Sequence, residues 1–430
     1  ATLASGAYSK VRRQFNQAIG NFEGIEEPLA RIGAYAYIMD AAVTLTVTSI
    51  VHGAKPSVAG AILKYHTTER SRQLIIDAMD IHGGKGICLG PNNYLGRGYQ
   101  GAPISITVEG ANILSRSLII FGQGAIRCHP YVLREIESVK NNDLEKFDKA
   151  FWGHVRFVLA NFVKSILFSF TDARLTKAPA GETRRYYQLL HRYSSNLAFL
   201  ADFCMIMLGG ALKRKEKLSA RLGDLLSNLY LASAVLKRFH QDGEPIDDLP
   251  LVEWCCQQLF HECALAIQGV IDNFPSRGGK IVLKLILQPL GVQRRKPSDS
   301  LGAKLARILM TPGHTRNRLT RLAFSEATEN CPLGRVEQAF HKICSVELLE
   351  KKIMRGVKEG KLQTLTLLEQ IDEAVLCAII SKEEGESLRE AELARQEVIA
   401  VDDFNNNELS RLLDTSKQKI NQDNVSIEAI

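Results

Sequence analysis

The chain has 430 residues, enough to bury the cores of two or three domains, which excludes a small disulfide-stapled protein. Hydrophobic residues make up 45% and charged residues 23%, beside 32 glycines and 13 prolines, a composition that excludes wholesale disorder and collagen-like repeats. The net charge is +7, but residues 382–430 hold 6 basic and 12 acidic side chains, which leaves +13 on residues 1–381 and suits an acidic or phosphorylated partner.

No apolar run reaches the roughly 18 residues that a membrane-spanning helix needs, so we expect no span. The opening residues lack the layout of an export signal, and because Ala1 leads directly into helical periodicity we expect a fragment of a longer protein. Most of the nine cysteines lie in apolar helical settings, which predicts free thiols in a reducing compartment and hence a cytoplasmic protein.

Helical periodicity dominates the chain, and no convincing strand is found. Short Gly and Pro breaks separate the helical segments, so the predicted fold class is all-α. Two apolar stripes with helical spacing consist of Ile32, Tyr35, Ala36, Met39 and Val43, and of Leu222, Leu225, Leu226 and Leu229. A charged helix with a solvated face is predicted over residues 381–395.

Two early segments offer contacts to a phosphate. Arg12 and Arg13 precede Phe15, and guanidinium forks beside an aromatic ring suit a pyrophosphate, although most such pairs are ordinary surface. The glycines of DIHGGKG, residues 80–86, let backbone amides approach an anion, yet their spacing is not that of a Walker loop or a dinucleotide-binding fingerprint. This run equally fits the end of a helix.

Glu109 is the sharpest candidate for chemistry. It precedes Gly110 at the start of the apolar helix in ITVEGANIL, residues 106–114, where a carboxylate commonly just complements a helix N-terminus. A buried Glu109 facing a carbon acid would instead act as a general base, because burial raises the pKa of a carboxyl. The functional interpretation therefore expects Glu109 to be buried beside a cavity.

Three cysteines and a histidine gather near residue 260, but their spacing does not match a zinc site. The run contains Cys255, Cys256, His261 and Cys263 without a CxxC pair, so we expect buried structural thiols and no metal. The sequence also lacks HExxH and GxSxG motifs, which argues against zinc proteases and α/β-hydrolases.

Residues 280–290, KIVLKLILQPL, are apolar and flanked by cations. Arg277 precedes them, and Arg294, Arg295 and Lys296 follow. This pattern fits an anionic membrane interface and fits a buried helix with charged ends about equally well. The basic residues do not alternate with aromatic ones as nucleic-acid modules require, so no nucleic-acid partner is expected.

Three segments in order carry a family resemblance. YSKVRRQFNQAIGNFEGIEEPLA (residues 8–30), DIHGGKG and TVEGANIL (residues 107–114) together resemble the C-terminal part of acyl-CoA dehydrogenases, of the large bacterial long-chain type that acts in fatty-acid degradation. The resemblance implies that residues 1–135 form the family's C-terminal helical bundle and residues 136–404 the additional helical domain of the large enzymes. Residues 405–430 are expected to be a flexible tail.

The resemblance implies FAD-dependent oxidation of a long-chain acyl-CoA to trans-2-enoyl-CoA, the first step of β-oxidation, with electrons passing to an electron-transferring flavoprotein or a similar acceptor. Glu109 matches the catalytic base, and Gly110 the substrate-contacting glycine beside it. The positions that match contacts to the FAD of a neighbouring subunit, and so imply a homodimer, are Arg12, Gln14, Phe15, Asp80, Gly83 and Gly84. Asp80 departs from the Gln common at its position.

The residues leave a second class of function open. The helical second half would then be an interaction module that mediates oligomerisation or attaches the protein peripherally to the inner membrane through residues 277–296.

Overall fold

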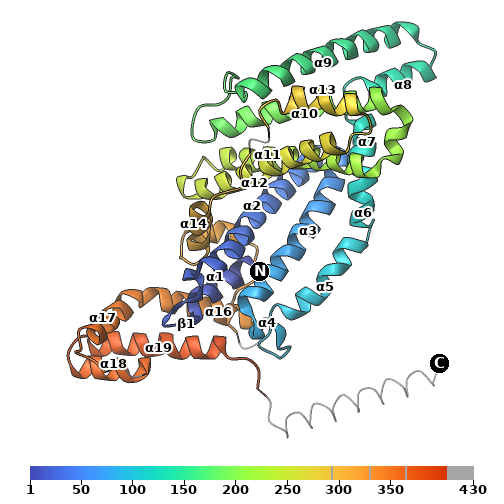
Figure 1. Ribbon diagram of the computed structural model, residues 1–430. Coiled ribbons are helices and arrows are strands. Elements are labelled where there is room, and N and C mark those ends of the chain that lie inside the picture. Colours follow the sequence, from blue (N-terminus) through green and yellow to red (C-terminus); the bar gives the residue numbers. More distant parts are fainter. Residues whose placement is uncertain (292–293, 329–330, 364–365, 404–430) are drawn as a thin grey trace, which may run out of the picture. The chain divides into compact units, whose positions relative to one another are not determined.

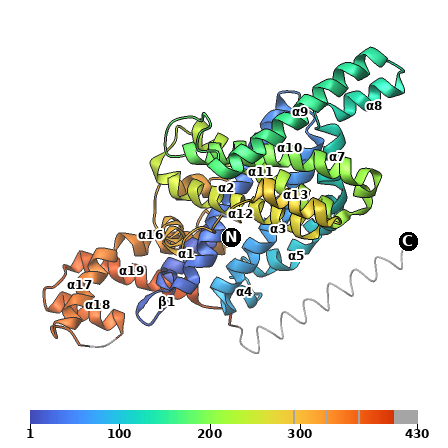
Figure 2. The same ribbon diagram turned by 45° about the horizontal axis from the view of Figure 1, so that its top comes forward.

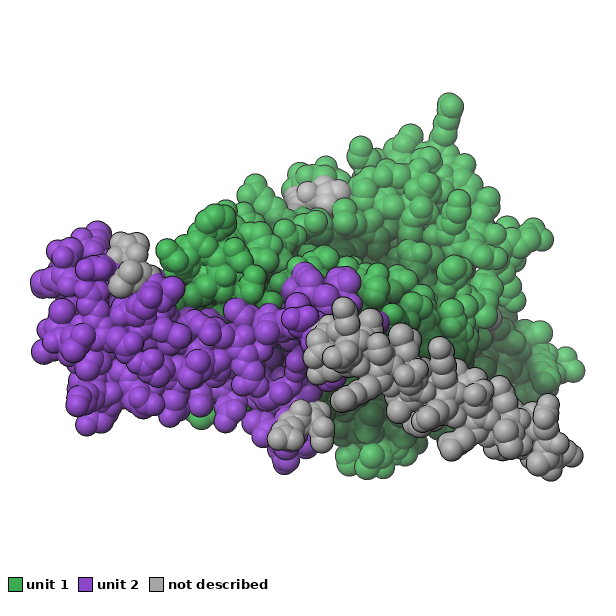
Figure 3. Space-filling model, turned by 90° about the horizontal axis from the view of Figure 1, so that it is seen from below, with its two compact units in different colours: residues 1–81, 98–323 green, residues 82–97, 324–430 purple. Residues whose placement is uncertain are grey.

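The computed structural model describes residues 1–291, 294–328, 331–363 and 366–403 (Figure 1). These residues confirm the all-α prediction, since the only strands among them are two strands of two residues each, which pair in one hairpin. The chain divides into two compact units, residues 1–81 with 98–323 and residues 82–97 with the segment from 324 onward (Figure 3). The predicted family boundary at residue 135 stays a prediction, and the predicted tail at 405–430 lies outside the described residues.

The elements follow in chain order. Up to the middle of the chain they are α1 (Thr2–Val11), β1 (Arg13–Gln14), β2 (Gln17–Ala18), η1 (Ile19–Asn21), α2 (Glu23–Val51), α3 (Ser57–His82), α4 (Gly84–Ile87), α5 (Gly96–Thr107), α6 (Asn112–Leu114), η2 (Ser115–Ile119), α7 (Ile120–Arg127), α8 (Val132–Lys140), α9 (Leu144–Thr171), α10 (Arg184–Leu208) and η3 (Gly209–Arg214). Beyond it they are α11 (Glu216–Gln241), η4 (Ile246–Asp248), α12 (Leu249–Asn273), α13 (Arg277–Leu287), α14 (Asp299–Leu309), α15 (His314–Thr320), α16 (Pro332–Ser345), α17 (Glu347–Lys358), α18 (Leu367–Leu376) and α19 (Lys382–Ile399).

The core of the first unit lies between α2, α11 and α12. Helices α11 and α12 run side by side, and α2 packs against both and against α14 (Figures 1 and 2). Leu222, Leu225 and Leu229 of α11 are buried, which confirms the predicted stripe. Cys255 and Cys263 of α12 are fully buried free thiols, as expected for structural cysteines.

The predicted apolar face of α2 was only partly right. Ile32 is buried as predicted, but Val43 is 40% exposed, and the buried face also includes Tyr37, Ile38 and Ala41. The reason is that α2 packs against α11, α12 and α14 and also meets α1 and α15, so it is covered over a wider arc than a surface helix. Alanines lie on this buried face. A periodicity analysis that counts mainly large apolar side chains underestimates their contribution.

The expectation that no segment is long and apolar enough to span a membrane was also wrong. In the described residues, Glu23–Val51 and Arg184–Arg214 reach the required length and hydropathy, and a bent pair of helices from Gly96 to Ala125 does so jointly. Helices α2 and α10 both contribute buried residues to the core of the first unit.

Helix α9 packs along α10 and also meets α8 and α13. Its start is set by Asp143, whose side chain accepts a hydrogen bond from the Lys146 N–H at 3.1 Å. Its end is Asp172, which takes the left-handed conformation that stops a helix.

The second unit contains α16 to α19. Ser381 and Glu384 form a capping box at the start of α19, confirming a charged helix there. The prediction of a merely solvated face was wrong at Arg395, which is buried and donates to Glu350 Oε1 at 2.8 Å.

Candidate active site

Glu109 lies in the turn between α5 and α6, three residues before α6 begins, which confirms that it precedes an apolar helix. Its backbone is left-handed with φ of 54°, and Gly110 follows with φ of 105°. A residue with a Cβ seldom adopts a positive φ, so surrounding contacts must hold this turn.

The Glu109 side chain is exposed, and among the described residues it makes no ion pair or side-chain hydrogen bond. The predicted burial is therefore wrong for the described chain. The contacts that hold the turn engage its backbone and Asn112, so nothing draws the carboxylate inward. The backbone N–H of Glu109 also lacks an acceptor in hydrogen-bond geometry among the described residues.

Lys64 of α3 holds the turn. Its Nζ donates to the Gly110 carbonyl oxygen at 2.5 Å, to Asn112 Oδ1 at 2.6 Å and to the Ile106 carbonyl oxygen at 3.4 Å. One ammonium group thus joins the last turn of α5, the loop and the start of α6.

Asn112 fastens the other side of the turn to α3. It is buried, and its side-chain nitrogen donates to Thr68 Oγ1 at 2.9 Å and to Glu69 Oε1 at 2.8 Å. Sequence analysis missed both Lys64 and Asn112, because more than forty residues separate the partners and neither residue forms a recognisable local pattern.

Arg12, Gln14 and Phe15 are brought together on one hairpin. Strands β1 and β2 pair Arg13 with Ala18 and are joined by Phe15 and Asn16, both with positive φ, as in a type I′ turn. Phe15 is 88% exposed, and its ring forms an edge-to-face pair with Phe22 at 6.3 Å between ring centres. A large aromatic residue in a left-handed, exposed position is costly for folding alone.

Asp80, Gly83 and Gly84 follow one another at the end of α3. Asp80 is exposed in the last turn, and Gly83 adopts φ of 54° and ψ of −129°, which requires glycine. A Cβ built on Gly83 or Gly84 would meet no atom within 4 Å. Packing within the described chain therefore does not explain Gly84, and the backbone there is open to a ligand.

A cluster of His129, His154 and Asp202 offers three metal-ligand atoms within 4.8 Å of one another. His129 Nδ1, however, accepts hydrogen bonds of 3.1 and 3.2 Å from two backbone N–H groups at the start of α8. The hydrogen of the neutral ring must then lie on Nε2, the atom that a metal would need.

The second imidazole of this cluster is placed between two carboxylates. His154 Nδ1 lies 2.9 Å from Glu135 Oε1, and its Nε2 lies 3.2 Å from Asp202 Oδ1, so the ring bridges two acidic side chains. We therefore interpret the cluster as a hydrogen-bonded link between α8, α9 and α10.

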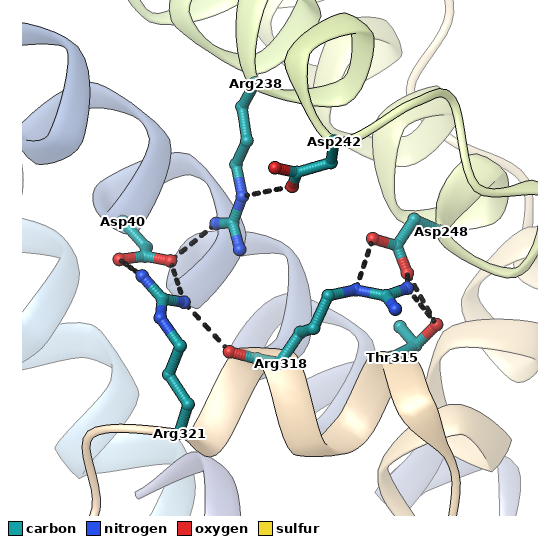
Figure 4. Close-up of polar contacts among 7 residues, drawn as sticks. All are labelled: Asp40, Arg238, Asp242, Asp248, Thr315, Arg318 and Arg321. Atoms are coloured by element: carbon teal, nitrogen blue, oxygen red, sulfur yellow. Dashed lines mark hydrogen bonds and ion pairs between the residues drawn. The ribbon is translucent and has the colours of Figure 1, made fainter.

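A cavity of about 680 Å³ in the first unit is bordered by three arginines, and Figure 4 shows that each is already paired. The pairs join Arg238 to Asp40 and Asp242, Arg318 to Asp248, and Arg321 to Asp40. Arg321 meets both oxygens of Asp40, at 2.7 and 3.0 Å. Because aspartates occupy the guanidinium groups, this cavity carries no signal for an anionic ligand.

The basic segment after α13 is partly used inside the fold. Arg294 pairs with Asp172, which also binds Arg185 and Arg192. Burial raises the pKa of the Asp172 carboxyl, but attraction from the three arginines outweighs it, so the pKa lies below its ordinary value. Arg294 is therefore engaged inside the fold and does not belong to the cationic flank that was predicted for residues 280–290 to bind a membrane.

The chain matches two family models. Residues 126–404 match the model described as acyl-CoA dehydrogenase, C-terminal, bacterial type, and residues 2–121 match acyl-CoA dehydrogenase, C-terminal domain. The fold resembles the crystal structure of an acyl-CoA dehydrogenase complexed with FAD from Bacillus anthracis, with a TM-score of 0.53 and 17% identity over 72% of this chain and 52% of that chain. The chain thus spans about half the length of that relative. Since the first model covers more than half of its residues, the chain belongs to the acyl-CoA dehydrogenase family.

Proposed function

We propose that the chain supplies the base of an FAD-dependent acyl-CoA dehydrogenase that oxidises long-chain acyl-CoA to trans-2-enoyl-CoA in the first step of β-oxidation. The family match supports the reaction class, and the resemblance to the large bacterial enzymes supports the long-chain substrate. The observation that carries the proposal is the Glu109 turn, where the carboxylate has no partner among the described residues and Lys64 fixes the backbone at Gly110.

In this proposal Glu109 removes a proton from the α carbon of the acyl thioester while a hydride leaves the β carbon. The C–H electron pair at the α carbon forms the new double bond, and the proton stays on Glu109. Bound FAD supplies the acceptor for the hydride. The Glu109 backbone N–H, which has no acceptor among the described residues, is available to the thioester carbonyl and would acidify the α hydrogen.

Four of the residues proposed to contact FAD have the chemistry and the exposure that this group needs. Arg12 supplies a guanidinium fork, exposed Phe15 a stacking surface, and Gly83 and Gly84 an open backbone. Asp80 does not fit, because an exposed carboxylate repels a pyrophosphate. We therefore assign no cofactor role to Asp80.

The length of α3 supports the proposal of a homodimer that shares its cofactors. Lys64, which holds the Glu109 turn, and Asp80 are separated by sixteen residues of one helix, roughly 24 Å at 1.5 Å per residue. The Glu109 turn and the Asp80 end of α3 are thus far apart, which suits contacts to two different FAD molecules. We further propose a cytoplasmic enzyme that passes electrons to an electron-transferring flavoprotein or a similar carrier.

The proposal is tested by anaerobic bleaching of the flavin with a long-chain acyl-CoA. The full-length protein is compared with its Glu109→Gln variant, and bound FAD is quantified in both. Loss of bleaching in the variant with FAD retained supports Glu109 as the base. Equal bleaching in both proteins would assign the chemistry to another carboxylate.

A second proposed function is peripheral attachment to an anionic membrane through α13. Ile281, Val282 and Leu285 of this helix are exposed, beside exposed Arg277 and Lys284. Vesicles that contain anionic lipid should bind the protein at low salt, and a variant with Arg277→Glu and Lys284→Glu should bind less. Flotation that is equal for both proteins would reject this attachment.

A further inference from the structure

We infer that Lys64 is the positioning residue that sets the geometry of the Glu109 base. The inference rests on the proposed function for its consequence in catalysis, but its structural part stands on contacts within the first unit alone. Lys64 acts through the backbone of the turn, since its three hydrogen-bond acceptors belong to Ile106, Gly110 and Asn112.

Lys64 uses every donor that it has. An ammonium group carries three hydrogens, and the Lys64 Nζ has three oxygen acceptors. Each acceptor comes from a different part of the segment: the end of α5, the loop and the first residue of α6. A side chain with fewer than three donor hydrogens, such as methionine or glutamine, cannot donate to all three acceptors.

The acceptor at Gly110 is the one that fixes the base. Glu109 and Gly110 both have positive φ, so the peptide between them lies in a backbone conformation that residues with a Cβ seldom adopt. Lys64 donates to the Gly110 carbonyl oxygen at 2.5 Å. It thereby restrains the Gly110–Ala111 peptide, which directly follows the peptide between Glu109 and Gly110. The carboxylate remains free for a proton transfer, while its backbone cannot rotate without breaking hydrogen bonds.

Lys64 and Asn112 together form a clamp on the turn, in which Lys64 holds the Gly110 carbonyl and Asn112 links the start of α6 to α3. Asn112 Oδ1 accepts from Lys64, and its nitrogen reaches Thr68 and Glu69, one turn further along α3. Because Lys64 and Thr68 stand four residues apart, they lie on the same face of α3, and the turn is held against a single helix. The backbone that carries the base is therefore tied to α3, which serves the preorganisation that catalysis requires.

The test combines hydrogen–deuterium exchange with flavin reduction in the full-length protein. Lys64→Met removes the ammonium and keeps a good helix former, Lys64→Arg restores part of the donor set, and Lys55→Met is the matched control at an exposed site before α3. Exchange is followed in peptides that cover residues 104–114, because exchange reports local opening. Stopped-flow bleaching gives the reduction rate constant and the apparent acyl-CoA affinity.

We expect Lys64→Met to raise exchange in residues 104–114 and to slow flavin reduction about 10- to 100-fold with little change in acyl-CoA affinity, because displacement of a catalytic group mainly reduces the chemical rate. Lys64→Arg should give intermediate values, and Lys55→Met should match the wild type. Unchanged exchange in Lys64→Met would overturn the clamp. Faster exchange with an unchanged reduction rate would overturn its positioning role.

The two proposals fail in different ways. If wild-type flavin is not bleached by any acyl-CoA, the proposed function fails, and the exchange comparison still decides the clamp. If bleaching requires Glu109 but is indifferent to Lys64, the function stands and the positioning inference fails.

Discussion

Glu109 and Asp172 make a matched pair within the first unit. Both are acidic residues just past the end of a helix, and both adopt the left-handed conformation, with φ of 54° and 52°. Asp172 is tied to Arg185, Arg192 and Arg294, whereas Glu109 makes no such contact among the described residues.

The difference separates a structural carboxylate from the one that we propose as the base. At Asp172 the side chain carries the interaction, and the left-handed backbone merely ends α9. At the Glu109 turn Lys64 binds the backbone at Gly110, and the Glu109 side chain has no partner among the described residues. Exposure alone would make Glu109 an ordinary surface residue, but its exposure on a strained turn that Lys64 holds supports the proposed role.

The largest effect is expected from Glu109→Gln. Removing a general base should slow flavin reduction by about 10²- to 10⁴-fold, and since the side chain has no partners the free energy of unfolding should change by less than about 0.5 kcal/mol. Stopped-flow reduction and urea unfolding measure the two quantities. Glu137→Gln, at an exposed site on α8, is the control, and an equal loss of rate in that variant would contradict the assignment.

Asp172→Asn should have the opposite profile. Asn tolerates the left-handed conformation, so the substitution removes charge from the three arginines and leaves the backbone intact. We expect a loss of about 3 kcal/mol in unfolding free energy, the lower end for a broken buried pair, because Asp172 keeps some contact with water. Urea denaturation measures it, and a loss below 1 kcal/mol would mean that the cluster is not structural.

Acid should remove the same stabilisation. The arginines hold the folded pKa of Asp172 below its ordinary value of 3.8, so its contribution is fully present above that value and is lost as the pH falls through the folded pKa. The gap in unfolding free energy between wild type and Asp172→Asn should therefore be constant above about pH 5 and shrink below pH 4. A constant gap down to pH 2 would contradict this.

The variants Gly83→Ala and Gly84→Ala distinguish a glycine that the backbone conformation requires from a glycine that allows a ligand to approach closely. Alanine at Gly83 should cost about 1–3 kcal/mol of stability, because φ of 54° with ψ of −129° is strained for any residue with a Cβ. Alanine at Gly84 has free space, so it should leave the midpoint of thermal unfolding unchanged and lower FAD retention. Full FAD retention in Gly84→Ala would remove the glycine from the proposed cofactor site.

The smallest effect is expected at Phe15. Asparagine suits the first position of a type I′ turn, so Phe15→Asn should stabilise the hairpin by about 0.4–1 kcal/mol and weaken FAD binding through loss of the ring. Thermal unfolding and flavin fluorescence measure the two effects. Destabilisation together with intact FAD binding would make Phe15 a structural residue.

Local features of the fold followed from the sequence. The leucine stripe of α11 and the position of Glu109 before a helix depend on neighbours within a few turns, so periodicity predicted them. The buried face of α2 followed only in part, because several packing helices decide it. The Lys64 contact to Gly110 joins residues 46 apart, and no local pattern encodes such a pair.

The Lys64 contacts also bear on chemical durability. Thioesters acylate amines, and a lysine attacks only through a nitrogen lone pair, which the ammonium form lacks. The Lys64 ammonium gives all its hydrogens to oxygen acceptors, so attack would require breaking three hydrogen bonds and freeing a half-buried group. The lysine that holds the base would thus resist acylation by the thioesters that the protein is proposed to oxidise.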